Sequence, residues 1–219
     1  MAGCSSWPTQ DPIEDQEAAR RNPFLSRDDM RAVLSRSLRL YQQRTGGRLP
    51  NRVVIHKTTA FRASELEGAN DALATVRELE CIEVTTRTAW RGVWLKAARN
   101  AGQKSEPDRY PVQRGTVQPL TGTSTLLWVA GNAPSASTTG NYYQGGKSIP
   151  GPMMITRHAG SGSLALAATE VLALSKMDWN NDALYDPVPV TIRYSQRLAR
   201  TIANVPNIRR EIYPYRLFM

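Results

Sequence analysis

The sequence predicts an α/β domain built on a mixed sheet, and three observations lead to this fold class. Apolar residues recur at helical spacing from Ser26 to about residue 45, after a capping signal formed by Ser26 and Asp29. A short β-branched run at 52–57 follows, and then a second helical pattern with a capping signal at Ser64 and Glu67. Several strand-like runs and two more helical patterns complete an order typical of layered α/β domains.

Local patterns predict the remaining elements. The helix at 161–177 is apolar enough that we expect it to be buried, and the last helix runs from about Val190 to Asn204. Residues 99–113 and 131–151 read as loops, and residues 1–22 as an irregular tail that precedes one domain at 23–219. The expected strands after the second helix are CIEVTTRT, GVWLKA, GTVQPL, STLLWVAG and PMMITRH.

The charge of the chain points to a polyanionic partner. The formal net charge is +9, and the segment 187–219 holds six arginines but one acid, Glu211. The two cysteines, Cys4 and Cys81, exclude a disulfide framework and a cysteine-rich metal site. The sequence shows neither a long apolar run nor a secretory signal, so we expect a cytoplasmic protein without a membrane span.

Few residues suit catalysis. A metal-dependent nuclease needs several carboxylates that converge on divalent ions, yet the strand at 52–57 is followed by Thr58, and the next acid is Glu65. The segment 187–207 lacks Asp, Glu and His, which leaves Asp178 and Asp182 as the nearby acids. Cys81 is expected to be an inert core thiol. His56 is interpreted as a hydrogen-bonded histidine at a sheet edge rather than as a base.

Binding is better supported by the residues from 175 to 200. The last helix carries Arg193, Arg197 and Arg200 on one side, and its free N–H groups follow Pro189. A basic, an aromatic and two amide side chains precede it, a mixture found in nucleic-acid sites: Lys176, Trp179, Asn180 and Asn181. A solvated basic helix with Trp179 in the core fits the same residues, so the residues alone leave both readings open.

Four segments in this order carry a resemblance to a known family: RVVIHKTTAFRASELEGANDAL, RGTVQPLTGTSTLLWVAGN, PGPMMITRH and ATEVLALSKMDWNNDALYDPVPVTIRYSQRLARTIA. Together they resemble the C-terminal part of the PIWI domain of prokaryotic Argonautes, over residues 24–219. The resemblance implies a ribonuclease H-like fold, a mixed sheet with flanking helices, which is incomplete without upstream strands. It also implies a basic face that holds a short guide strand paired to a target.

Two departures from the family bear on cleavage. Cleaving members carry an Asp where this chain has Thr58, and an Asp or His in the segment where it has Tyr194, Ser195 and Gln196. The resemblance therefore implies a domain that does not cleave the target strand, and we expect that the protein is not an enzyme. It also implies Mg²⁺ at the guide 5′-phosphate, held with the terminal carboxylate of Met219 and a MID-containing chain or segment.

The expected function is guide-directed nucleic-acid binding by a cleavage-inactive domain, within a prokaryotic defence complex that includes a separate effector protein. Its expected partners are a short guide RNA or DNA and a complementary target. Two alternatives stay open: a guide-directed endonuclease completed by a partner chain, and a protein-docking scaffold. The expected contact residues are Lys176, Trp179, Asn180, Asn181, Arg193, Tyr194, Arg197 and Met219.

Overall fold

The computed structural model describes residues 24–96, 102, 104–136, 138, 140, 143, 149–178 and 187–205. The tail expected at 1–22 and the C-terminal segment YPYRLFM, which was expected to dock on the domain, lie outside these residues. The chain divides into two compact units. The first comprises the chain up to Glu83, Arg157–Gly162 and the chain from Thr191, and the second comprises Val84–Thr156 and Ser163–Val190.

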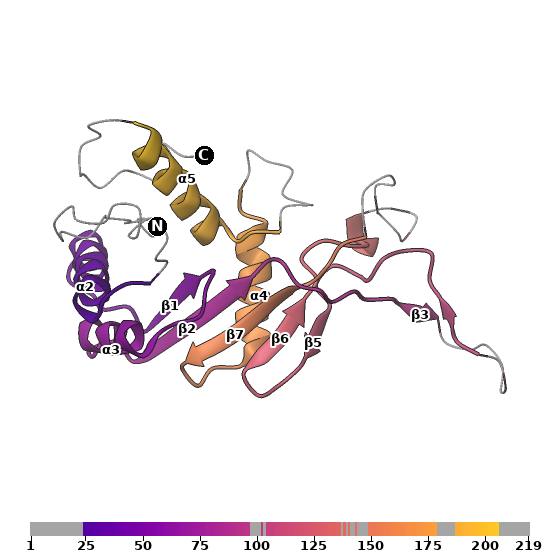
Figure 1. Cartoon of the computed structure of the whole chain (residues 1–219), viewed down its shortest axis with the longest axis horizontal. Coiled ribbons are helices and arrows are strands. Elements are labelled where there is room, and N and C mark those ends of the chain that lie inside the picture. The colour runs from indigo at the N-terminus through magenta and orange to yellow at the C-terminus, as the bar shows by residue number, and fades with distance from the viewer. Residues whose placement is uncertain are drawn as a thin grey trace. The chain divides into compact units, whose positions relative to one another are not determined.

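The predicted mixed sheet is confirmed. Five strands pair in the order β1-β2-β7-β6-β5 (Figure 1), with β1 and β2 parallel and the pairs β5–β6 and β6–β7 antiparallel. A separate antiparallel ribbon joins β3 and β4. The strands are β1 (Arg52–Lys57), β2 (Glu78–Thr85), β3 (Leu95–Lys96), β4 (Glu106–Pro107), β5 (Val117–Pro119), β6 (Ser124–Leu127) and β7 (Met153–Ala159).

Four α-helices and one 3₁₀ turn accompany the strands in the described residues. The helices are α2 (Arg27–Arg44), α3 (Ala63–Ala72), α4 (Leu164–Ser175) and α5 (Val190–Asn204), and the turn is η1 (Pro134–Ala136). Figure 1 shows α2 beside α3 at the amino-terminal end of the chain. In the second unit α4 lies against β6 (Figure 1).

Side-chain alternation along β1 and β2 assigns each residue to one face of the sheet. Ile55 and Cys81 are paired in register and contribute to a core cluster with Met30 of α2 and Ala69 of α3. The helices α2 and α3 therefore cover this face, which we call the core face. His56 pairs in register with Ile82 on the opposite face.

Several helix and strand boundaries agree with the sequence prediction. Ser26 caps α2 as expected, because its Oγ accepts the backbone N–H of Asp29 at 3.1 Å. The strand β1 covers 52–57 as predicted, although its residues are half-buried rather than fully buried. The helix α5 begins at Val190 and ends at Asn204, as predicted.

Three local predictions are wrong. The N-cap of α3 is Arg62, two residues before the predicted cap Ser64, because the Glu65 carboxylate accepts the backbone N–H of Arg62 at 2.9 Å. Of the strand expected at 92–97, the described residues 92–96 form only the two of β3. The apolar helix α4 is buried on one face alone, around Ala168 and Val171, and Leu166 stays 47% exposed.

Candidate nucleic-acid interface

The helix α5 is strongly two-sided. Its packed side holds Ile192, Tyr194 and Leu198, each at most 6% exposed. Arg193, Arg197 and Arg200 recur at i, i+4 and i+7, so they share one stripe along the helix, which we call the arginine stripe. Arg200 is exposed, whereas Arg193 and Arg197 are half-buried. The sequence therefore places three guanidinium groups in a row on a helix whose other side is fixed by packing.

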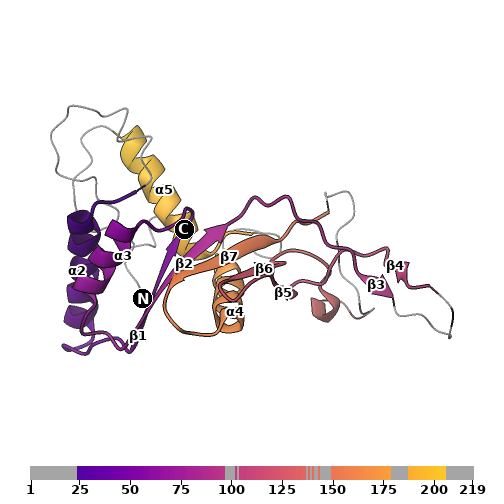
Figure 2. The ribbon, with the colours of Figure 1, turned by 60° about the horizontal axis from the view of Figure 1, so that its bottom comes forward.

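A hydrogen bond ties the start of α5 to the sheet. The Nδ1 atom of His56, next to last in β1, lies 3.0 Å from the Oγ1 atom of Thr191. The Ser195 hydroxyl donates to the Thr191 carbonyl oxygen at 2.8 Å within the helix. His56 is therefore a hydrogen-bonded histidine at the sheet, as predicted. In Figure 2, α5 begins near the carboxyl-terminal ends of β1 and β2, on the face opposite the core face.

Tyr194 lies on the packed side of α5 and contacts Arg197 of the arginine stripe. Its ring is 6% exposed, and the Arg197 guanidinium carbon lies 5.8 Å from the ring centroid. A guanidinium over a tyrosine face is attracted by the ring quadrupole. The expected contact residue Tyr194 thus lies in the packed layer, with the Arg197 guanidinium over its ring.

The carboxyl end of β1 contains a buried ion pair. Lys57 Nζ lies 2.5 Å from Glu65 Oε1, and the Glu65 carboxylate also accepts the backbone N–H groups of Leu25 at 3.0 Å and Arg62 at 2.9 Å. Burial alone would raise the pKa of Glu65, but these donors together lower it below its ordinary value. Glu65, the first acid after Thr58, is therefore fully occupied by structural contacts, whereas Thr58 itself is exposed.

A second ion pair lies on the core face. His158 Nε2 of β7 is 2.8 Å from Glu83 Oε2, and the His158 ring lies 5.6 Å from the ring of Phe61. Burial raises the pKa of the Cys81 thiol to about 12, which agrees with the inert core thiol expected there. Within the described residues, no three His, Cys, Asp or Glu side chains come together in a way that could hold a metal ion.

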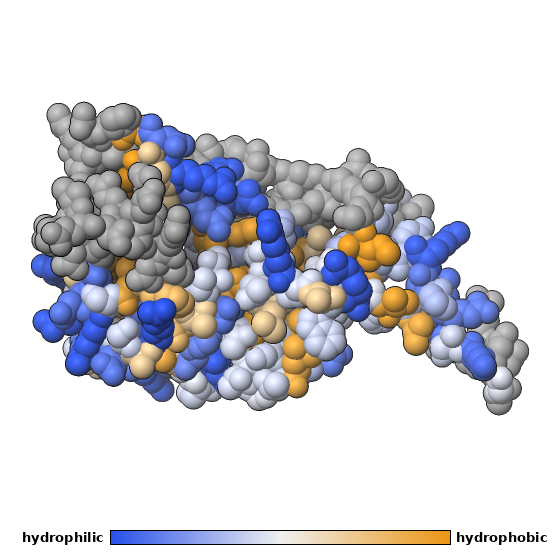
Figure 3. Space-filling view, in the orientation of Figure 1, coloured by the Kyte–Doolittle hydropathy of each residue, from blue (hydrophilic) through white to orange (hydrophobic). Residues whose placement is uncertain are grey.

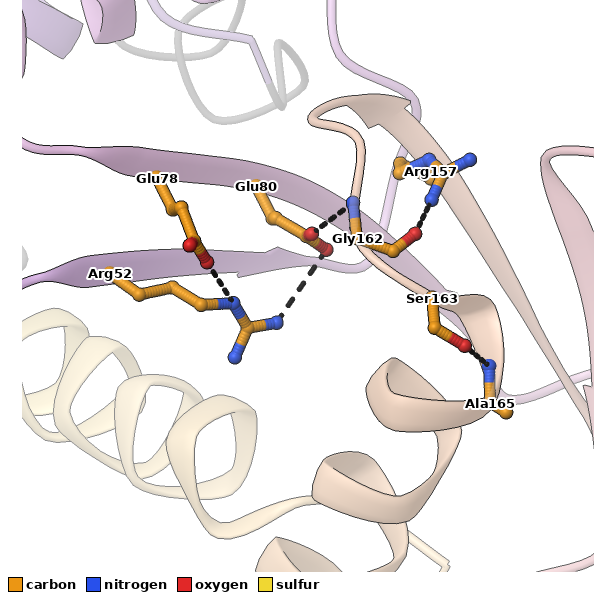
Figure 4. Close-up of polar contacts among 7 residues, drawn as sticks. All are labelled: Arg52, Glu78, Glu80, Arg157, Gly162, Ser163 and Ala165. Carbon is orange, nitrogen blue, oxygen red and sulfur yellow. Dashed lines mark hydrogen bonds and ion pairs between the residues drawn. The ribbon is translucent and has the colours of Figure 1, made fainter.

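A polar network occupies the other face of β1 and β2 (Figure 4). Arg52 lies 3.6 Å from the buried Glu80 and 3.9 Å from Glu78, and the backbone N–H of Gly162 donates to Glu80 Oε1 at 2.8 Å. Arg157 donates in turn to the Gly162 carbonyl oxygen. A Cβ atom at Gly162 would overlap the Glu80 carboxylate, so a larger residue here would displace that carboxylate from its present contacts.

This network was not predicted from the sequence. An available signal was Glu80, a charged residue that alternates in phase with the apolar Ile82 in the middle of β2. A buried carboxylate needs a partner, so its position alone predicts a nearby cation or backbone donor.

The other sequence-predicted residues fall in different places. Lys176 is the residue after α4, half-buried in the second unit, and its N–H donates to the Ala173 carbonyl oxygen. Asp178, considered as a metal ligand in the enzyme alternative, is 1% exposed. Four expected contact residues and the second acid of that alternative lie outside the described residues: Trp179, Asn180, Asn181, Met219 and Asp182.

Solved structures of other proteins share this fold, although no family model and no curated protein matches the sequence. Among solved structures, Clostridium butyricum Argonaute bound to a guide DNA and a 19-mer target DNA matches with a TM-score of 0.62 and 13% identity, over 88% of this chain and 23% of that chain. Aquifex aeolicus Argonaute (Aa-Ago) with externally bound siRNA matches with a TM-score of 0.57 and 14% identity, over 82% of this chain and 22% of that chain.

The C-terminal lobe of a budding yeast Argonaute matches with a TM-score of 0.55 and 13% identity, over 83% of this chain and 40% of that one. The chain therefore spans less than half of each of these structures. None of the described helices has the length and apolar character needed to cross a membrane. The mixed sheet with its flanking helices has the ribonuclease H-like α/β fold of the PIWI portion of Argonautes, as the resemblance implied.

Proposed function

We propose that the chain holds a guide strand paired to its target by their backbone phosphates, and that it does not cleave the target. The observation that carries the proposal is the arginine stripe of α5, fixed to β1 through the His56–Thr191 hydrogen bond. The stripe belongs to a fold shared with a structure that is described as bound to a guide DNA and a target DNA. Arginine suits this role because its planar fork can make two parallel bonds to one phosphate.

The chemistry of the arginine stripe bears on how the target sequence would be recognised. Guanidinium groups that bind phosphates position a duplex but carry little sequence information. Base pairing between guide and target would then supply the sequence specificity. The helix must keep a fixed orientation for this purpose, which the packed side of α5 and the bond from His56 provide.

The residues at two positions support the proposal that the chain does not cleave its target. Thr58 offers a hydroxyl at the position where the resemblance implies the carboxylate of cleaving Argonautes, and Glu65 is engaged by Lys57 and two backbone donors. In α5, Tyr194 is buried, and the Ser195 hydroxyl donates to a helix carbonyl. Neither position supplies the negatively charged oxygen ligands that a divalent metal ion prefers.

The remaining parts of the proposal involve other residues and chains. Lys176, Trp179, Asn180 and Asn181 are proposed as further contacts to the guide. The terminal carboxylate of Met219 is proposed to help hold Mg²⁺ at the guide 5′-phosphate, together with a MID-containing partner. A separate effector in a prokaryotic defence complex is proposed to act when the target is bound.

Binding of a short guide–target duplex by the full chain tests the proposal. We expect the Arg193→Ala/Arg197→Ala variant to bind at least about tenfold more weakly than wild type, because each lost charge-assisted bond costs about 1.5–3 kcal/mol. The variant Arg39→Ala/Arg44→Ala removes the same charge from exposed positions of α2 and serves as the matched control. Equal affinity of wild type and the α5 variant would overturn the proposal.

A cleavage assay separates the proposal from the endonuclease alternative. The chain is incubated with guide, labelled target and either Mg²⁺ or Mn²⁺, with and without candidate partner chains. We expect the target to stay intact. Guide-directed cuts that disappear in an Asp178→Ala variant would show that the chain contributes a catalytic acid and would refute the inactive reading.

A further inference from the structure

The segment Arg87–Lys96, which we call the tryptophan strip, exposes an unusual amount of apolar surface. Trp90 and Trp94 are 52% and 48% exposed, and Val93 and Leu95 are 66% and 57% exposed. Large aromatic side chains normally bury most of their surface, so two half-exposed indoles close together indicate an interaction site. Figure 3 shows hydrophobic and hydrophilic side chains side by side over the ribbon of β3 and β4.

The strip is anchored at several points, so its tryptophans are held in place. A Cβ atom at Gly92 would come within 2.6 Å of the Trp128 ring and 2.7 Å of Val112, so the Gly92 backbone lies directly on this apolar cluster. The Thr88 hydroxyl donates to the Pro152 carbonyl oxygen at 2.7 Å. The N–H of Asp108 donates to the Trp94 carbonyl oxygen at 2.7 Å. Trp90 and Trp94 therefore flank an anchored stretch of backbone around Gly92.

The charged side chains within the strip are all basic. Arg87, Arg91 and Lys96 are exposed, and the ten residues contain no acid. Arg91 Nη1 donates to the carbonyl oxygens of Thr88 at 3.2 Å and Trp90 at 2.7 Å, which holds its guanidinium against the backbone of the strip. Lys96 is partly neutralised by Asp108 at 3.6 Å, so the cationic character is strongest around Arg87 and Arg91.

We propose that the tryptophan strip binds single-stranded nucleic acid, with bases stacked on Trp90 and Trp94 and backbone phosphates at Arg87 and Arg91. Exposed aromatic side chains interleaved with basic ones form the platforms that bind single strands without sequence preference. The four residue steps from Trp90 to Trp94 span at most about 14 Å, a reach that a few nucleotides can cover. The strip lies in the second unit, so this site is additional to the duplex site proposed on α5.

A protein partner is the competing occupant, because Val93 and Leu95 are also exposed. Aliphatic side chains contribute little to base stacking, whereas they would matter in an apolar protein interface. The two pairs of residues can therefore be tested against each other. The tryptophan pair reports on a nucleic-acid strand, and the aliphatic pair reports on an apolar partner.

The test is fluorescence anisotropy of labelled oligo(dT) and oligo(U) at low salt with the full chain. We expect Trp90→Ala/Trp94→Ala to weaken binding at least about fivefold for each tryptophan removed. Trp90→Phe/Trp94→Phe should retain most of the affinity, because phenylalanine keeps a stacking face. The control Val93→Ala/Leu95→Ala should bind as wild type does.

Three outcomes would overturn the proposal: no binding by wild type, unchanged binding by the Trp→Ala pair, or an equal loss in the Val93→Ala/Leu95→Ala control. Unchanged binding by the Trp→Ala pair would instead favour an apolar protein partner as the occupant of the strip. Blunt duplex binding distinguishes this site from the one on α5. The Trp→Ala pair should bind the duplex normally, and the Arg193→Ala/Arg197→Ala variant should lose the duplex yet keep the effect of the tryptophans on single strands.

Discussion

The two faces of the β1–β2 pair differ in chemistry. The core face packs Ile55 and Cys81 against α2 and α3, and its ion pair between Lys57 and Glu65 is enclosed by the surrounding side chains. The opposite face carries the Arg52–Glu80 network and the His56–Thr191 bond at the start of α5. Both faces hold charged groups, yet the helix that carries the arginine stripe is bonded to the opposite face, through His56.

This difference separates stability from function. On the core face every carboxylate oxygen of Glu65 is engaged within the chain, so its charges have a structural role. On the opposite face, polar bonds orient a helix whose arginines belong to the proposed phosphate contacts. Substitutions on the core face should therefore change stability most, and substitutions on α5 should change binding most.

The largest expected effect on stability is at Glu65. Glu65→Ala leaves the Lys57 ammonium without its partner in a largely buried site, so we expect the free energy of unfolding to fall by about 3–5 kcal/mol. Urea unfolding followed by circular dichroism measures this change. The control Glu67→Ala removes an exposed acid of the same helix and should cost less than about 1 kcal/mol. Equal effects at both positions would contradict the structural role of the Glu65 pair.

Gly162 should have the next largest effect. Gly162→Ala places a methyl group on the Glu80 carboxylate, and we expect a loss of about 1–3 kcal/mol from the forced displacement. Thermal or urea unfolding provides the measurement. Gly122 has open space at its Cβ position, so Gly122→Ala is the matched control and should be close to neutral. A stable Gly162→Ala variant would show that Glu80 does not need the close approach of this loop.

The lowered pKa of Glu65 predicts a dependence of stability on acid pH. Because the folded-state pKa is below the unfolded value, the contribution is fully present above about pH 4.5 and is lost as the pH falls through the folded pKa. The difference in unfolding free energy between wild type and Glu65→Gln should thus shrink between about pH 5 and pH 3. A difference that stays constant over this range would mean that Glu65 does not titrate with folding.

The smallest expected effect on stability is at Thr191. Thr191→Val removes its hydroxyl from the bond to His56, so we expect a loss of about 1 kcal/mol and a several-fold weaker affinity for a guide–target duplex. Thr201→Val is the control, because the Thr201 hydroxyl bonds within α5 to the Arg197 carbonyl oxygen and does not reach the sheet. If both variants bind the duplex equally, the tie between α5 and β1 does not orient the stripe.

Much of this arrangement could be predicted from local sequence. The bounds of α5 and β1 follow from periodicity and from the prolines before Val190, and Arg193 and Arg197 follow from helical spacing. The α3 start was wrong because the tertiary contacts of Glu65 fix its capping role. The Arg52–Glu80 network joins positions 28 residues apart in the chain, and spacing rules do not reach such pairs.

The burial of Tyr194 illustrates the remaining limit. Helical spacing identifies the stripe of arginines, but it does not decide how much of the neighbouring face is covered by the sheet. The ring of Tyr194 is covered and lies under Arg197, so a residue expected to touch nucleic acid instead supports the residue that does so in our proposal.

The salt dependence of duplex binding tests the central claim most directly. The logarithm of the dissociation constant is measured against the logarithm of salt concentration for wild type, Arg193→Ala/Arg197→Ala and the control Arg39→Ala/Arg44→Ala. Each lost phosphate contact should flatten the slope by about 0.7–0.9, so the α5 variant should lose about 1.4–1.8, and the control should keep the wild-type slope. A wild-type slope in the α5 variant would contradict the claim that these arginines hold the backbone.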